Sequence, residues 1–207
     1  MKDVGHVTPF YRRRKFLRLP EYDYSQPGAY FVTICTQERK PIFGEIRNGI
    51  MGLNICGCVI VDCWMWIMKQ YPYVFLDEWM IMPNHFHGII VIQDMECRGG
   101  SRAAPTQKRK PLGQLIGAFK TVAAQSIRRV TGINGQKVWQ RNYFEHIIRD
   151  EKSWLKIQEY ILTNPLRWEL DRENPNHHSS DEFDTWLQSF KDHPNSSCLL
   201  LKNNSLR

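Results

Sequence analysis

One stretch constrains the fold of this chain more than any other: residues 85–92 read HFHGIIVI. Its apolar, β-branched content predicts a buried strand. Because side chains alternate along a strand, His85 and His87 share one face, and Phe86 begins the opposite row. The Phe86 row can pack into a core while both imidazoles project from the other face. Two parallel imidazoles favour one shared metal ion, although a hydrogen-bonded pair of surface histidines also fits the spacing.

The segments around this strand predict an α+β architecture. Strands are expected at 30–36, in a hairpin within 41–53, at 73–82, and in a short piece within 138–148; helices are expected at 54–69, at 112–130 and from 150 to 164. Asn54 and Asp150 are suitable helix N-caps, and Pro165 disfavours helical geometry at Asn164. This order predicts an antiparallel sheet with helices on its faces. We expect the two histidines in a site open to solvent, on the sheet face away from the first long helix.

Composition divides the chain into three parts. Residues 1–20 form a basic N-terminal arm, residues 21–171 form one domain, and residues 172–207 form a polar C-terminal tail with one possible amphipathic helix near 181–190. The net charge is +7, from 28 Lys and Arg against 21 Asp and Glu. That surplus is compatible with a polyanionic partner, nucleic acid first, although solubility alone also explains it.

Cysteine usage and hydropathy indicate a cytoplasmic protein. The basic start has no long apolar core, so no secretory signal is predicted, and reduced thiols are expected. Cys56, Cys58 and Cys63 lack a CxxC spacing and fit small buried hydrophobes better than a metal cluster. No apolar run reaches the ~18–20 residues that a membrane span needs.

Residues 82–88, MPNHFHG, resemble the HUH motif of the single-tyrosine transposases, in which two histidines flank a bulky apolar residue. Three further blocks resemble that family in the same order: GAYFVT at 28–33, WQRNYFEH at 139–146 and YILTNP at 160–165. The last two are most similar to the REP-associated tyrosine transposase branch. The resemblance implies a ferredoxin-like (RRM-like) antiparallel sheet, with the HUH motif on a central strand and a tyrosine on a C-terminal helix.

The resemblance also implies a chemistry. The family nicks and rejoins single-stranded DNA through a 5′-phosphotyrosine and a free 3′-OH. Tyr160 would be the nucleophile, and Tyr143 is its rival. A phenol has a pKa near ~10 and needs help at neutral pH, which a metal held by His85 and His87 could give. Asn164, one helical turn after Tyr160, would be a third ligand. Imidazoles alone suggest zinc or another transition ion, whereas the family uses Mg²⁺ or Mn²⁺.

The expected partner is single-stranded or hairpin DNA, because the REP-associated branch recognises short palindromic hairpins. A homodimer and a monomer both remain open. Two other classes compete with this hypothesis: a catalytically silent nucleic-acid-binding module, and a metallohydrolase that cleaves without a covalent adduct. The candidate contacts to the DNA backbone are basic residues: Arg12, Arg13, Arg14, Lys15, Lys108, Arg109, Lys110, Lys120, Arg128, Arg141 and Lys156.

Overall fold

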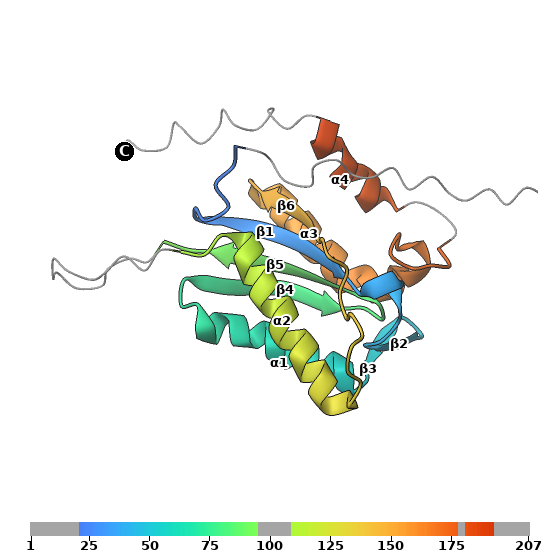
Figure 1. Ribbon diagram of the computed structural model, residues 1–207. Helices are drawn as coiled ribbons and strands as arrows, with labels where there is room; N and C mark the ends of the chain where they lie inside the picture. The colour runs from blue at the N-terminus through green and yellow to red at the C-terminus, as the bar shows by residue number, and fades with distance from the viewer. Residues whose placement is uncertain (1–20, 95–108, 178–180, 193–207) are drawn as a thin grey trace, which may run out of the picture.

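The computed structural model describes residues 21–94, 109–177 and 181–192 (Figure 1). The basic arm lies outside these residues, and so do five of the candidate DNA contacts: Arg12, Arg13, Arg14, Lys15 and Lys108. None of the helices in the described segments has the length and apolar content needed to span a bilayer.

A four-stranded antiparallel sheet forms the centre of the fold. Its strands are β1 (Gly28–Cys35), β4 (Val74–Ile81), β5 (His85–Ile92) and β6 (Phe144–Ile148), in the spatial order β4-β5-β1-β6. With its helices, this is the βαββαβ arrangement of a ferredoxin-like fold, as predicted. The histidine strand β5 lies between β4 and β1, and its register places His85 opposite Cys35 and His87 opposite Thr33.

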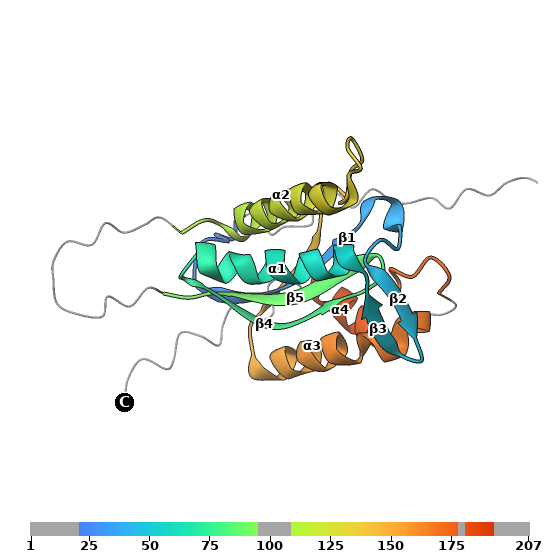
Figure 2. The same cartoon turned by 90° about the horizontal axis from the view of Figure 1, so that it is seen from below.

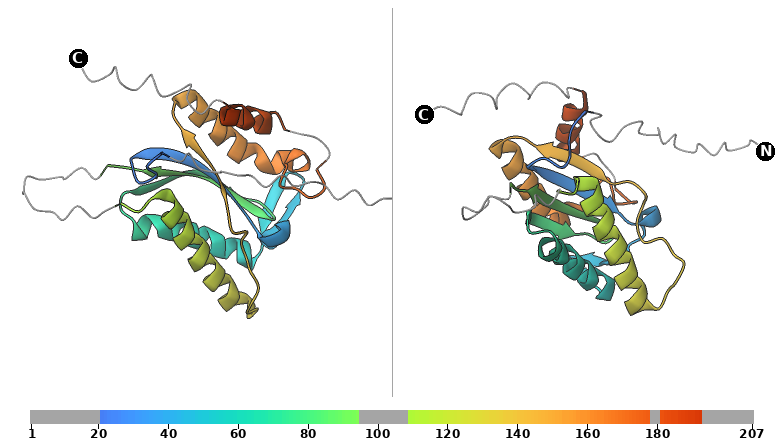
Figure 3. Two further views of the ribbon diagram at one scale, coloured as in Figure 1. Left: turned by 45° about the horizontal axis from the view of Figure 1, so that its top comes forward. Right: turned by 60° about the vertical axis from the view of Figure 1, so that its left-hand side comes forward.

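Two helical layers cover the two faces of the sheet. Helices α1 (Ile55–Gln70) and α2 (Leu112–Thr131) lie on one face, and α3 (Glu151–Thr163) and α4 (Glu182–Asp192) lie on the other (Figures 2 and 3). Phe86 is fully buried under the first layer, with its ring centroid 4.6 Å from that of Trp64 and 5.7 Å from that of Phe119. The Phe86 row therefore packs into a core, as the alternation predicted.

Local sequence signals explain the connections. Strands β2 (Gly44–Arg47) and β3 (Ile50–Leu53) form the expected hairpin, with Asn48 and Gly49 both at positive φ, as a tight hairpin turn requires. The side chain of Asn54 caps α1 by accepting from two backbone amides. Cys56 and Cys63 are buried free thiols within that helix, as expected, whereas the free thiol of Cys58 is exposed, so the prediction was wrong for that residue.

The chain beyond α3 returns to the sheet. The 3₁₀ segment η2 (Asn164–Leu170) follows α3 directly, with Pro165 in its first turn. Residues 171–177 and α4 then pack over the domain, and Phe183 and Leu187 are buried there. The amphipathic helix expected near 181–190 corresponds to α4. The boundary placed at residue 171 from composition thus falls inside packed structure, because Phe183, Trp186 and Leu187 of α4 pack against the apolar cluster on this face of the sheet.

Candidate active site

Five polar side chains meet on the α3 and α4 face of the sheet. His85 and His87 extend from β5, Tyr160 extends from α3, Asn164 begins η2, and Asp171 follows η2. The Nε2 atoms of the two imidazoles lie 2.9 Å apart. The Asp171 carboxylate lies 3.5 Å from Nε2 of His85 and 3.9 Å from Nε2 of His87. Both imidazoles thus share one site, on the face away from α1.

This site is buried, so the prediction that it is open to solvent was wrong. The exposed fraction is 0% for His85, 1% for His87, 2% for Asp171 and 4% for Tyr160. Helix α4 covers Tyr160: the Phe183 ring stacks on the Tyr160 ring at a centroid distance of 3.7 Å and an interplanar angle of 8°. The error arose because residues after 171 were expected to form a polar tail.

Burial sets the protonation of the cluster. It lowers the pKa of His85 to about 3, which keeps that imidazole neutral. Burial alone would raise the pKa of Asp171, but the two imidazoles and the Glu173 amide outweigh it and hold that pKa below its usual value. Burial raises the pKa of Tyr160 well above its ordinary range. A neutral imidazole and an ionised carboxylate are the forms that bind metal ions.

The donor set fits a divalent cation. Asn164 donates from Nδ2 to the Asp171 carboxylate at 2.9 Å, and its Oδ1 is buried without a hydrogen-bond partner among the described residues. Such an orphaned oxygen costs about 1–3 kcal/mol unless something binds it. Ligand atoms of His85, His87 and Asp171 all lie within 4.8 Å of one another. Asp171 was missed in the sequence, where nothing distinguishes it from other acidic residues near the C-terminus.

A layer of buried charges surrounds these donors. Arg172 donates from Nε to Glu173 at 3.1 Å and pairs with Asp184 of α4 at 3.1 Å. Glu173 also pairs with Arg39 at 2.9 Å. The guanidinium of Arg172 lies 5.2 Å from the centroid of the Phe144 ring. Its positive charge acts to lower the pKa of Tyr160, against the effect of burial.

The rival nucleophile lies on the other face. Tyr143 packs against the core that α1 and α2 cover, whereas the Tyr160 hydroxyl is 3.4 Å from Nε2 of His87. Among the described tyrosines, Tyr160 is the one with a hydroxyl in hydrogen-bond contact with the histidine pair.

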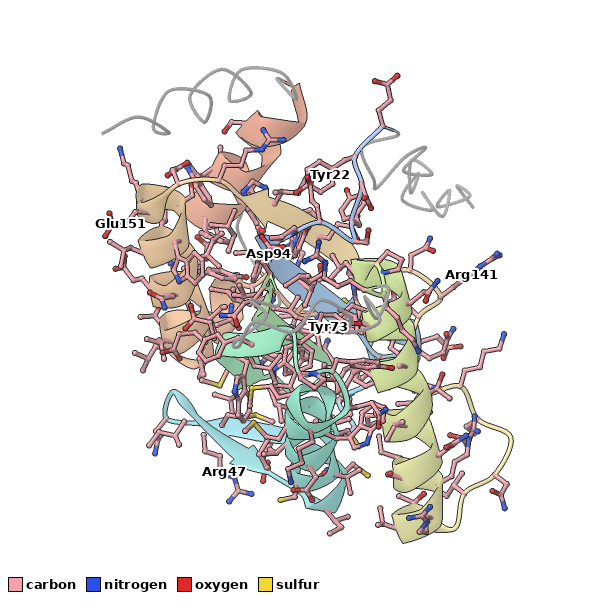
Figure 4. The ribbon with its side chains drawn as sticks, turned by 90° about the vertical axis from the view of Figure 1, so that its left-hand side faces the viewer. Tyr22, Arg47, Tyr73, Asp94, Arg141 and Glu151 are labelled. Carbon is pink, nitrogen blue, oxygen red and sulfur yellow. The ribbon has the colours of Figure 1, made fainter. Side chains whose placement is uncertain are left out.

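Six of the candidate DNA-contact residues lie in the described part of the chain. Five of them have partners within the protein, and the sixth, Arg141, lies on the other side of the sheet from α3. Lys120 on α2 donates to the carbonyls of Gln140 and Arg141, and burial lowers its pKa to about 8. Arg141 lies beside α2, on the other side of the sheet from Glu151 at the start of α3 (Figure 4). Further contacts occupy the remaining four: Arg109 pairs with Asp94, Lys110 bonds to Tyr71, Arg128 to Gln136, and Lys156 lies over the Trp186 ring.

Comparisons with known proteins find two proteins of similar sequence and solved structures of similar fold. No family model matches the chain. A Haemophilus influenzae protein described as uncharacterized is 42% identical over 169 residues, which cover 77% of this chain and 92% of that protein. A protein of the same organism named "Putative REP-associated tyrosine transposase" is 26% identical over 148 residues, covering 70% and 74%. The solved structure of a REP-associated tyrosine transposase bound to a REP hairpin aligns with a TM-score of 0.51 at 16% identity, covering 73% of each chain.

An antiparallel sheet that carries paired histidines on a central strand, with helices on both faces, is the fold of the tyrosine transposases of the HUH type. The resemblance to the REP-associated tyrosine transposases that the sequence motifs predicted is confirmed. The chain belongs to one family with the 42% identical Haemophilus influenzae protein.

Proposed function

We propose that this protein is a metal-dependent single-stranded DNA endonuclease and strand transferase in which Tyr160 is the nucleophile. The observation that carries this proposal is the 3.4 Å contact between the Tyr160 hydroxyl and Nε2 of His87. It joins a phenol to a cluster whose nitrogen and oxygen donors fit a divalent cation. The similarity to a transposase and the net charge of +7 support the same conclusion.

The reaction balances as two phosphoryl transfers. The Tyr160 oxygen attacks the scissile phosphorus, an O–P bond forms, and the bond from phosphorus to the upstream 3′ oxygen breaks. The phenol loses its proton and the departing 3′ oxygen gains one. The downstream strand stays on the protein as a 5′-phosphotyrosine, and attack by a 3′-OH on that linkage rejoins the DNA.

The residues of this chain prepare that step. A Mg²⁺ or Mn²⁺ ion bound by His85, His87 and Asn164, with Asp171 as a further oxygen donor, would supply positive charge for the phosphate and the developing phenolate. Burial raises the pKa of Tyr160, and so do the Asp171 and Asp184 carboxylates, which keeps the phenol protonated in the resting protein; the charge of Arg172 acts in the opposite direction.

Single-stranded DNA that contains a hairpin is the proposed substrate. The structural neighbour was solved with a REP hairpin, which supports this choice. Because Tyr160 is 4% exposed under Phe183, the scissile phosphate reaches the phenol only after α4 has moved.

The test is end-labelled single-stranded hairpin DNA incubated with the full chain and Mg²⁺ or Mn²⁺, followed by denaturing electrophoresis. We expect 3′-labelled DNA to migrate with the protein, and 5′-labelled DNA to give a shorter free fragment. EDTA should abolish both products. Cleavage without an adduct would favour a metallohydrolase, and binding without cleavage would favour a silent nucleic-acid-binding module.

A further inference from the structure

Asn84 stands between the histidine strand and the segment that carries Asp171. Its side chain is 1% exposed. Its Oδ1 lies 2.8 Å from Nδ1 of His85. Its Nδ2 donates to two backbone carbonyls, that of Glu173 at 2.7 Å and that of Arg39 at 3.2 Å. One amide group thus contacts a metal-donor histidine and holds the chain two residues after Asp171.

These contacts fix which way the amide points. A backbone carbonyl only accepts hydrogen bonds, so the two carbonyls of Glu173 and Arg39 require the NH₂ group of Asn84. The amide oxygen must therefore face His85. An amide oxygen also only accepts, so Nδ1 of His85 carries the proton. In the neutral imidazole this leaves Nε2 with a free lone pair directed at His87.

The second histidine has a different kind of partner. Nδ1 of His87 lies 2.9 Å from the hydroxyl of Thr33, which is 1% exposed. A hydroxyl can either donate or accept, so Thr33 permits both neutral forms of His87. Without an ion, the 2.9 Å contact between the two Nε2 atoms requires a proton on His87 Nε2, because His85 Nε2 has none. If both Nε2 atoms were to ligate one ion, His87 Nε2 would give up that proton, and the neutral imidazole would carry its proton on Nδ1 instead.

We propose that Asn84 and Thr33 are the positioning residues of this site: Asn84 holds His85 in its Nδ1–H form whether or not metal is bound, and the Thr33 hydroxyl lets His87 exchange one neutral form for the other when metal binds. The inference rests on the proposed metal-dependent function. His85 thus offers Nε2 to a metal in a fixed tautomer, because the Asn84 amide has a single orientation. His87 can change its tautomer, because the Thr33 hydroxyl rotates.

Nitrogen NMR of the full chain with ¹⁵N-labelled histidine tests the two tautomers directly. The signals are assigned by their loss in His85→Gln and His87→Gln. In EDTA we expect Nδ1–H at His85 and Nε2–H at His87. Saturating Zn²⁺ or Mg²⁺ should change His87 to Nδ1–H and leave the tautomer of His85 unaltered. Nε2–H at His85 in EDTA would overturn the role of Asn84, and an unchanged His87 would overturn that of Thr33.

Two threonine variants distinguish a positioning role of the Thr33 hydroxyl from a purely structural one. Thr33→Val keeps the shape but removes the hydroxyl, and we expect calorimetric Zn²⁺ affinity to fall about 10- to 100-fold. Thr36→Val is the matched control, because Thr36 is equally buried and, among the described residues, its hydroxyl contacts the backbone carbonyls of Lys40 and Asn84 and neither imidazole. That control should keep wild-type affinity. Equal affinities in wild type and Thr33→Val would refute the role of Thr33.

Asn84→Ala should leave His85 as a mixture of both tautomers in EDTA. Should this variant fail to fold, the wild-type spectrum already decides the role of Asn84. The proposed function has its own test, which is whether the wild-type protein binds Zn²⁺ or Mg²⁺ in calorimetry. If it binds neither ion, the metal-dependent function is refuted, and so is the proposal that His87 changes its neutral form when metal binds. The metal-free tautomer of His85 still decides the Asn84 assignment in that case.

Discussion

Replacing Tyr160 with Phe removes one oxygen atom and little else. The described hydrogen bond of that oxygen is the 3.4 Å contact to Nε2 of His87. The ring keeps its stacking on Phe183 and its edge contact with Phe31 at a centroid distance of 6.2 Å. The variant should therefore lose the chemistry of the phenol while it retains the apolar packing around Phe31 and Phe183 on the α3 and α4 face of the sheet.

The magnitudes follow from these contacts. A typical hydrogen bond contributes about 0.5–1.5 kcal/mol, and 3.4 Å is long, so Tyr160→Phe should change the free energy of unfolding by less than about 1 kcal/mol. Tyr160→Ala removes a buried stacked ring and should cost about 3–5 kcal/mol. With a urea slope of about 2 kcal/mol per M, the midpoint should fall by less than about 0.5 M for Phe and by roughly 1.5–2.5 M for Ala.

The assay compares wild type, Tyr160→Phe, Tyr160→Ala and Tyr143→Phe in urea unfolding, and wild type and the two Phe variants in covalent-adduct formation with hairpin DNA. We expect Tyr160→Phe to unfold near the wild-type midpoint and to form no adduct, while Tyr143→Phe forms one. An adduct in Tyr160→Phe that is absent from Tyr143→Phe would refute our reasoning and move the nucleophile to the other face of the sheet. Cleavage by both variants without an adduct would favour hydrolysis.

Four shorter predictions concern the same site. Asp171→Asn should weaken Zn²⁺ or Mg²⁺ binding about tenfold or more by calorimetry, because it removes the anionic donor. Phe183→Ala should increase the initial rate of DNA cleavage, since it removes the ring stacked on Tyr160. Burial lowers the pKa of His146 from 6.5 to about 4. Between these two pH values the unfolded chain binds a proton at His146 and the folded chain does not. Unfolding free energy should therefore fall between pH 7 and 5, and fall less in His146→Gln. Affinity for hairpin DNA, by fluorescence anisotropy, should drop steeply between about 50 and 200 mM salt.

The sequence predicted the parts of the fold that local rules control. Alternation along residues 85–92 assigned His85 and His87 to one face and Phe86 to the other, because the two-residue period of a strand holds in any context. The Asn-Gly turn of the hairpin and the Asn54 cap are likewise decided by neighbouring residues. The spacing of Tyr160 and Asn164 placed both on one side of a helix, and both side chains lie in the buried site.

Long-range packing decided what the sequence could not predict. Asp171 lies 84 residues after His87, and no periodic pattern connects them. The apolar side chains Phe183, Trp186 and Leu187 have helical spacing, which correctly indicated a helix. Nothing local indicates where that helix docks, and its docking covers the Tyr160 ring with Phe183. Partners such as the Asp184 carboxylate against Arg172 depend on that docking.

The contacts on the α3 and α4 face divide into two sets with different consequences for access. Asp171 is held by hydrogen bonds to Asn164 and to the backbone amide of Glu173, and the Glu173 carbonyl is held by Asn84. These hydrogen bonds connect the segment 171–173 to the residue before β5 and to the start of η2. Helix α4 is held instead by apolar packing of Phe183, Trp186 and Leu187 and by the Arg172–Asp184 ion pair. A base can take the place of the stacked Phe183 ring, and a phosphate can take the place of the Asp184 carboxylate. Displacing α4 would therefore expose Tyr160 and leave the hydrogen bonds of Asn164, Asp171 and Asn84 in place.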